Sequence, residues 1–134
     1  MTDLGKQIEI GIEISTLTKT AYNPIEEDAR NPIHTPDYAK KHGMRGALVG
    51  GSTLLSYVLE MLYDYFGRNW LTLGKIKVSF IGGGAINGDV VTAHGMIKQR
   101  EEQENGTQVT LDVWLENQRN EKILVGEASC LESD

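Results

Sequence analysis

The chain has 134 residues, of which 40% are hydrophobic and 24% are charged, and this length and composition predict one soluble globular domain spanning residues 1–134. The formal net charge of −6, with basic residues scattered among acids, argues against a nucleic-acid partner. The single cysteine, Cys130, excludes a disulfide within the chain and a cysteine-based metal site. No apolar run has the length of a signal peptide or a membrane span. We therefore expect a cytoplasmic protein.

The first predicted element is a strand that begins at Ile8. Isoleucines at positions 8, 10, 12 and 14 alternate with polar residues and glycine, which is the period of a half-buried strand. The segment 18–36 that follows carries three prolines, and each removes a backbone donor and biases the residue before it away from helix. We therefore expect a loop here, with at most one helical turn around residues 26–29.

Two helices are predicted after this loop. The sequence PDYAKKHG has a proline in the first turn and a glycine at its end, which is typical of a short helix. A longer helix is expected from Ser52 to about Phe66, because its apolar residues form two adjacent ridges at helical spacing. Ser52 or Thr53 is the expected cap, and Gly67 is expected to end the helix.

The rest of the chain has the alternation of strands. They are expected at residues 75–80, 89–101, 107–118 and 123–131, with turn signals between the last three. In the strand at 107–118, apolar residues occupy one face and mostly polar residues the other. One apolar helix and one sheet with a single buried face predict a two-layer α+β fold, with the helix across the concave side of a twisted antiparallel sheet.

The proline-rich loop contains a candidate catalytic histidine. His34 lies beside Asn31 and Pro32, and histidine titrates near neutral pH, so His34 is the strongest general acid or base candidate of this loop. The alternative is a loop histidine that bonds only to the backbone. We interpret His42, at the end of the short helix, as a partner of the helix dipole, and His94, in a strand, as an ordinary exposed or half-exposed residue.

Gly50, Gly51 and Ser52 form a candidate substrate-binding group at the start of the long helix. Unpaired N–H groups at a helix start attract an oxygen that carries negative charge, and glycine lets a ligand approach the backbone, which is the geometry of an oxyanion hole. Two glycines also suit a sharp turn into a helix. A second run, GGGAINGD at residues 82–89, precedes no helix, so we interpret it as a hairpin connection rather than a phosphate cradle.

Four segments resemble the MaoC-like hot-dog family, which includes the (R)-specific enoyl-CoA hydratases: NPIH, DYAKKHGMRGALVGG, STLLSYVLEML and LGKIKVSFIGGGAINGDVV. The resemblance extends from about residue 8 to residue 131. It implies a hot-dog fold, in which the sheet wraps around the long helix, and a place in fatty acid metabolism. It also implies a homodimer whose sheets join edge to edge, or a higher homo-oligomer. Substrates of the family are acyl thioesters of coenzyme A or acyl carrier protein, so no separate cofactor and no metal are expected.

The resemblance also assigns roles to residues. In the family hydratases, an Asp and a His in the pattern D-x-N-P-x-H activate a water for addition across the 2,3 double bond, and a glycine N–H at the helix start holds the thioester oxygen. Position by position, His34 matches the family histidine, Asn31 the asparagine that shapes the loop, and Gly51 the oxyanion glycine.

The sequence departs from the family pattern at the aspartate. That position is Ala29 here, with Asp28 one residue earlier, and a methyl group cannot transfer a proton. Asp28 is therefore the candidate partner of His34. The alternatives are that Glu26 or Glu27 takes this role, that His34 acts alone, or that the reaction is not hydration.

Three functions follow from the residues and the resemblance. The leading one is an acyl-thioester hydratase or dehydratase. The second is a hot-dog thioesterase, which needs a carboxylate on the long helix, where Glu60 and Asp64 are the only acids and lie on the polar face. The third is a non-catalytic subunit that binds acyl thioesters, favoured by Ala29 and by Gly50, which stands where the family usually has a histidine.

Overall fold

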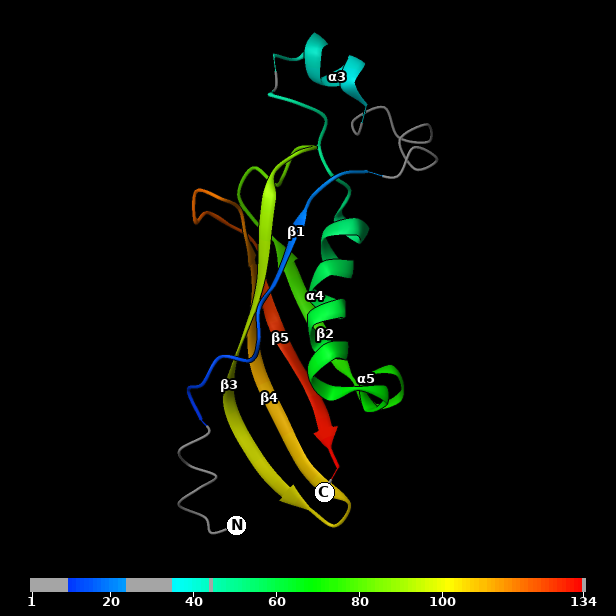
Figure 1. The fold of residues 1–134 in the computed structure, drawn as a ribbon, viewed down its shortest axis with the longest axis vertical. Helices are drawn as coiled ribbons and strands as arrows, with labels where there is room; N and C mark the ends of the chain where they lie inside the picture. The colour runs from blue at the N-terminus through cyan, green and yellow to red at the C-terminus, as the bar shows by residue number, and fades with distance from the viewer. Residues whose placement is uncertain (1–9, 24–34, 44, 134) are drawn as a thin grey trace.

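The computed structural model describes residues 10–23, 35–43 and 45–133. Within these ranges the chain forms a five-stranded antiparallel sheet in the order β1-β3-β4-β5-β2, with three helices (Figure 1). The strands are β1 (Leu17–Thr20), β2 (Lys75–Phe80), β3 (Val90–Gln103), β4 (Gly106–Glu116) and β5 (Lys122–Glu132). The helices are α3 (Pro36–Lys41), α4 (Gly51–Phe66) and α5 (Arg68–Leu73).

The core lies between α4 and one face of the sheet, so the predicted two-layer α+β architecture is confirmed (Figure 1). The sheet buries the apolar residues that alternate along β4, which are Val109, Leu111, Val113 and Leu115. The helix buries Leu54, Val58, Met61 and Leu62. Burying apolar side chains of this size removes enough surface from water to hold a single helix against the sheet.

The connection between β2 and β3 is not a hairpin, so that interpretation of residues 82–89 is wrong. The strand β2 pairs with β5, whereas β3 pairs with β1 and β4, and the chain therefore crosses the end of the sheet between β2 and β3. Gly82, Gly84 and Gly88 take φ values of 66°, 71° and 96°, which permit the successive bends of this crossing. The crossover brings residues 82–89 to the end of the sheet where α4 begins (Figure 1).

The first strand is shifted from its predicted position. The regular strand is Leu17–Thr20, while Glu13 makes only a single bridge, to Met96 of β3. Gly11 takes a left-handed φ of 85°, which interrupts the extended backbone there. The isoleucines at positions 10 and 12 are consequently exposed. Of the three isoleucines in this stretch that the structure describes, only Ile14 is buried. Ile8 lies outside the described residues.

The long helix starts one residue earlier than predicted and ends as predicted. Its N-cap is Gly50, without a side-chain hydrogen bond, so the prediction that Ser52 or Thr53 caps it is wrong. Gly67 ends it with a φ of 69°. The short helix α5, which the sequence reading did not predict, follows directly and buries Trp70.

Candidate functional site

The structure describes part of the predicted site. Gly50, Gly51 and Ser52 are described, whereas His34, Asp28 and Asn31 lie outside the described residues, so their roles stay predictions. Glu26, Glu27 and Ala29, the other positions considered, lie outside the described residues as well. The described part of the site is the start of α4 with the segments that pack around it.

The first N–H groups of α4 are available to an acceptor. The carbonyl oxygen of Gly50 accepts the N–H groups of Thr53 and Leu54, both at 3.1 Å. No described residue accepts a hydrogen bond from the N–H of Gly51 or Ser52. Because the peptide dipoles of a 16-residue helix add up toward its N-terminus, these two N–H groups favour an oxygen carrying negative charge.

The buried side chain of Asn23 holds the residue that begins this helix. Its Oδ1 accepts the N–H of Gly50 at 2.7 Å, and its Nδ2 donates to the carbonyl oxygen of Leu48 at 2.6 Å. The N–H of Asn23 itself donates to Oδ1 of Asn87 at 2.9 Å. The sequence predicts only a loop around Asn23, although the Asn-Pro pair that it forms with Pro24 is a signal for a specific turn.

Three segments distant in sequence meet around this asparagine. They are residues 21–23, residues 45–50 before α4, and the crossover 82–89. Backbone hydrogen bonds join them from Ala21 N to Asp89 O (2.7 Å), Gly88 N to Ala21 O (2.7 Å), Asn87 N to Ala47 O (2.9 Å) and Val49 N to Ala85 O (2.8 Å). The glycine-rich crossover thus helps to position the start of α4.

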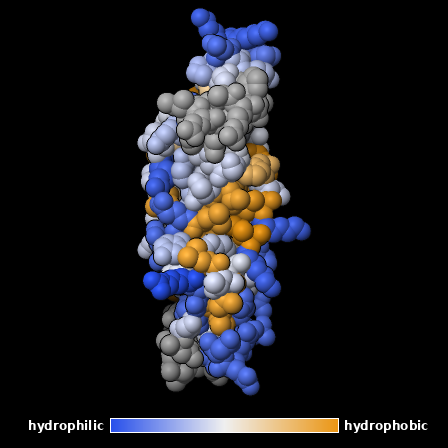
Figure 2. All heavy atoms as spheres, turned by 90° about the vertical axis from the view of Figure 1, so that its right-hand side faces the viewer, coloured by the Kyte–Doolittle hydropathy of each residue, from blue (hydrophilic) through white to orange (hydrophobic). Residues whose placement is uncertain are grey.

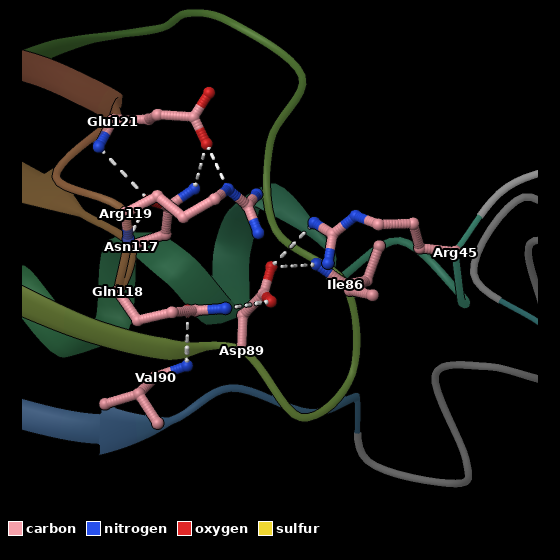
Figure 3. A network of polar contacts seen from close by, with 8 residues as sticks. All are labelled: Arg45, Ile86, Asp89, Val90, Asn117, Gln118, Arg119 and Glu121. Atoms are coloured by element: carbon pink, nitrogen blue, oxygen red, sulfur yellow. Dashed lines mark hydrogen bonds and ion pairs between the residues drawn. The ribbon is translucent and has the colours of Figure 1, made fainter.

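Asp89, at the end of the crossover, anchors the same region (Figure 3). It is 3% exposed and accepts the N–H of Ile86 and the side-chain amide of Gln118, each at 3.0 Å, while Nη2 of Arg45 lies 3.5 Å from Oδ2. Burial by itself would raise the pKa of Asp89, but the bonds from Gln118 and Ile86, together with the Arg45 charge, outweigh it and lower the pKa below the usual value for aspartate.

An apolar pocket of about 380 Å³ opens beside the start of α4. Its lining includes Gly51 and Leu54 of α4 together with Phe80, Ile81 and Ile123. A Cβ atom at position 51 would lie 3.0 Å from Cζ of Phe80, so the ring can pack this closely only because residue 51 is glycine. The arrangement suits a ligand with an apolar chain and an oxygen that accepts N–H groups.

The two carboxylates considered for a thioesterase do not line this pocket. Glu60 and Asp64 are both exposed, and Glu60 pairs with Lys19 of β1, whose Nζ lies 3.0 Å from Oε2. They lie on the polar side of α4, as the sequence indicated.

The two described histidines also lie away from the helix start. His42 caps the end of α3, with Nδ1 3.0 Å from the carbonyl oxygen of Tyr38. His94 is more constrained than an ordinary half-exposed residue, because its two ring nitrogens contact Glu13 (3.1 Å) and Glu116 (3.0 Å) and its ring stacks on Trp114. The sequence alone could not bring these partners together, because Glu13 and Glu116 lie on other segments.

Two kinds of feature are not found in the part of the chain that the structure describes. No three His, Cys, Asp or Glu side chains there are grouped as metal ligands would be. No helix among the same residues is long and apolar enough to cross a membrane.

Comparison with known proteins places this geometry in a fold class. No family model matches the sequence, and no curated protein is significantly similar to it. One similar solved structure is the monoamine oxidase regulatory protein of Archaeoglobus fulgidus, with a TM-score of 0.71 and 26% identity, covering 96% of this chain and 93% of that one. A second is the (R)-hydratase PhaJ1 of Pseudomonas aeruginosa, with a TM-score of 0.74 and 16% identity, covering 94% of this chain and 83% of that one. A third is a MaoC-like dehydratase of Rhodospirillum rubrum, with a TM-score of 0.73 and 14% identity, covering 96% of this chain and 94% of that one.

These likenesses and the wrapped helix define a hot-dog fold, as predicted. More particularly, the fold is the one shared by MaoC-like dehydratases and (R)-hydratases, which confirms at the level of the fold the resemblance seen in the sequence.

Replacing Asn23 by alanine tests the clamp at the helix start. The change leaves the buried N–H of Gly50 and the carbonyl of Leu48 without this partner, so we expect the free energy of unfolding to fall by about 2 kcal/mol or more, measured by urea titration. The exposed Gln103→Ala change is the control and should alter it by less than about 0.5 kcal/mol. An equal, small effect of both changes would contradict the assigned role.

Acid titration tests the Asp89 network. Since the pKa of Asp89 is lower in the folded state than the value of about 3.9 for an unfolded aspartate, its stabilising contribution is present above pH 4 and is lost as the pH falls below about 4. We expect the free energy of unfolding of Asp89→Asn to depend less on pH between 5 and 3 than that of the unmodified protein. Gln103→Ala, which changes an exposed residue without a titratable group, should keep the original pH dependence.

Proposed function

We propose that the protein is an acyl-thioester hydratase or dehydratase. The observation that carries this proposal is the pair of N–H groups of Gly51 and Ser52, which have no described acceptor and lie at the start of α4 beside the apolar pocket at Phe80. The names of the similar structures, an (R)-hydratase and a MaoC-like dehydratase, support the same chemistry.

In the proposed reaction the thioester oxygen accepts the N–H of Gly51 while the acyl chain occupies the apolar pocket. His34 takes a proton from water as the water oxygen bonds to C3 of the enoyl group. The electrons of the 2,3 double bond move toward the thioester oxygen, where the helix start stabilises the developing negative charge. The proton that His34 took from water is then returned to C2 as the enolate collapses to the thioester, which leaves His34 in its starting state. Dehydration is the reverse sequence.

The described residues support Gly51 rather than Gly50 as the donor to substrate. The N–H of Gly50 is already engaged by Asn23, so Gly50 serves to hold the helix start. Asn23 also immediately precedes the segment that contains Asp28, Asn31 and His34, and that segment therefore begins from a residue bonded to the helix start. We propose His34 as general acid or base, Asp28 as its partner and Asn31 as the residue that shapes the loop.

The two other functions have less support. A thioesterase would need a carboxylate beside the thioester, and Glu60 and Asp64 lie on the exposed side of α4. A non-catalytic binding subunit is favoured by Ala29, but binding would use the same N–H groups, so the decisive difference is turnover.

We further propose a cytoplasmic location and no separate cofactor. The buried, free thiol of Cys130 suits a reducing compartment, and burial raises its pKa, which keeps the thiol unreactive. Coenzyme A or a carrier protein would enter as part of the substrate.

The reaction is tested with crotonyl-CoA and a longer enoyl-CoA, by following the absorbance of the conjugated thioester and identifying products by mass. His34→Ala should lower kcat/KM by about 10²- to 10⁴-fold, and Asp28→Asn by a comparable factor if it is the partner. His42→Ala, which removes the histidine at the end of α3, is the matched control and should keep the activity. Unchanged turnover in His34→Ala would rule out the assigned role, and thiol release without hydration would favour the thioesterase.

We also propose a homodimer that joins two sheets along β2. This strand is an edge of the described sheet, and large apolar side chains of α4, α5 and the end of β2 are exposed, namely Tyr63, Leu71, Leu73, Phe80 and Ile81. Figure 2 views the side of the molecule on which α4 lies and shows a band of hydrophobic side chains across its middle. An unpaired edge beside exposed apolar surface is the usual setting for association.

The backbone of Val78 gives a direct test of this dimer. The N–H of Ile81 points to Ile123 of β5, and strand alternation therefore directs the N–H of Val78 away from β5, toward the open edge. Val78→Pro should remove an intermolecular donor and yield a monomer of 14.8 kDa by sedimentation, whereas Val78→Ala keeps the N–H and should remain dimeric. A folded Val78→Pro dimer would contradict pairing along β2.

A further inference from the structure

Gly50, the residue that begins α4, is held by hydrogen bonds on both of its sides. Its carbonyl oxygen is shared between the N–H groups of Thr53 and Leu54, each at 3.1 Å, and its own N–H donates to the Asn23 side chain at 2.7 Å. Glycine has no Cβ to restrict its backbone, so its φ of −64° and ψ of 148° are kept by these bonds and not by its own shape. Loss of the Asn23 bond would therefore leave the first turn of α4 free to unwind.

The side chain of Asn23 is itself fixed in place. It is 5% exposed, and its Nδ2 donates to the carbonyl oxygen of Leu48 at 2.6 Å, two residues before Gly50. One amide group thus bonds to the chain at both residue 48 and residue 50. Because an amide group is planar, the chain that enters the helix cannot turn about one of these bonds without weakening the other.

Asn87 of the crossover holds Asn23 in turn. Its Oδ1 accepts the N–H of Asn23 at 2.9 Å, while its own N–H donates to the carbonyl oxygen of Ala47 at 2.9 Å. Two asparagines thus form a chain of hydrogen bonds that starts at the crossover and ends at the N–H of Gly50. The side chain of Asn87 therefore reaches the helix start through Asn23.

A small displacement of the helix start matters for the proposed reaction. The negative charge on the thioester oxygen develops in the transition state, so the Gly51 N–H acts on the rate only if it is aimed at the oxygen at that stage. A misplacement of about 1 Å can lower the rate of a reaction by about 10²-fold. The segment that contains His34 follows Asn23 in the chain, so Asn23 stands between that segment and the helix start to which it is bonded.

We propose that Asn23 is a positioning residue of the reaction and that Asn87 supports it. Asn23 acts through Gly50 rather than on the substrate, because its side chain keeps the first turn of α4 wound and so holds the N–H of Gly51 in one direction. The inference rests on the proposed function and adds the two residues that keep its geometry.

The first measurement is the amide ¹⁵N relaxation order parameter of Gly51 in the full chain, which reports the motion of that N–H bond and needs no substrate. We expect about 0.85 in the unmodified protein, as in rigid backbone, and a fall toward about 0.6 in Asn23→Ala. Asn23→Asp keeps an oxygen for the N–H of Gly50 and should show a smaller fall. Val109→Ala, which destabilises the buried core near the other end of the sheet, is the control and should leave the value unchanged (Figure 1).

The second measurement is the hydration of crotonyl-CoA, at a temperature where urea titration shows every variant to be folded. Asn23→Ala should lower kcat by about 10- to 100-fold and change the dissociation constant of butyryl-CoA, a saturated thioester that cannot be hydrated, by less than about threefold, because alignment matters most in the transition state. Asn87→Ala should lower kcat less. Adding it to Asn23→Ala should cause no further loss, since its side chain acts through Asn23, and Val109→Ala should keep kcat.

The inference is overturned if the order parameter of Gly51 in Asn23→Ala equals that of the unmodified protein, or if kcat falls no further in Asn23→Ala than in Val109→Ala. Asn23→Asp, the milder change, replaces Asn23→Ala in both comparisons if the alanine variant does not fold. Failure of the proposed function is a separate result. It would show as an unmodified protein that does not hydrate crotonyl-CoA while the order parameter of Gly51 still depends on Asn23.

Discussion

The hydrogen bond between the Asn23 amide and the Gly50 N–H is the interaction on which the candidate site depends. Gly50 has no side chain that could cap the helix, and its own N–H is held instead by a residue 27 positions away in the chain. The same amide holds Leu48 and, through its backbone, Asn87. The direction in which the first free N–H groups of α4 point is therefore decided by three loops together rather than by the helix alone.

The crossover from β2 to β3 links this clamp to the charges of the site. It contributes Asn87 to the clamp and Asp89 to the network with Arg45 and Gln118, and Gly82, Gly83 and Gly84 line the apolar pocket beside α4. A single loop thus contacts the helix start, lines the apolar pocket and carries the carboxylate that pairs with Arg45. A change in its path would alter all three, because these contacts share one backbone.

The position of Phe80 illustrates how close packing specifies residue 51. The ring lies where a Cβ on Gly51 would meet it at 3.0 Å, so the glycine serves two purposes at once. It leaves the N–H accessible and it lets an aromatic ring of β2 form the wall of the pocket. Because β2 is also the edge strand proposed to join the partner copy, formation of the dimer would place the partner near this wall.

The sequence by itself determined the two-layer α+β class, the extent of α4 and the apolar face of β4, because these depend on periodicities of 3.6 and 2 residues that are local to each segment. Its resemblance to MaoC-like proteins correctly indicated the hot-dog fold. It misplaced the first strand, where Gly11 breaks the alternation, and it took residues 82–89 for a hairpin. Only the tertiary structure decided that β2 pairs with β5, that Asn23 holds the N–H of Gly50 and that Arg45 pairs with Asp89. Each of these contacts joins residues far apart in the chain, and no local pattern records which distant segment supplies the partner.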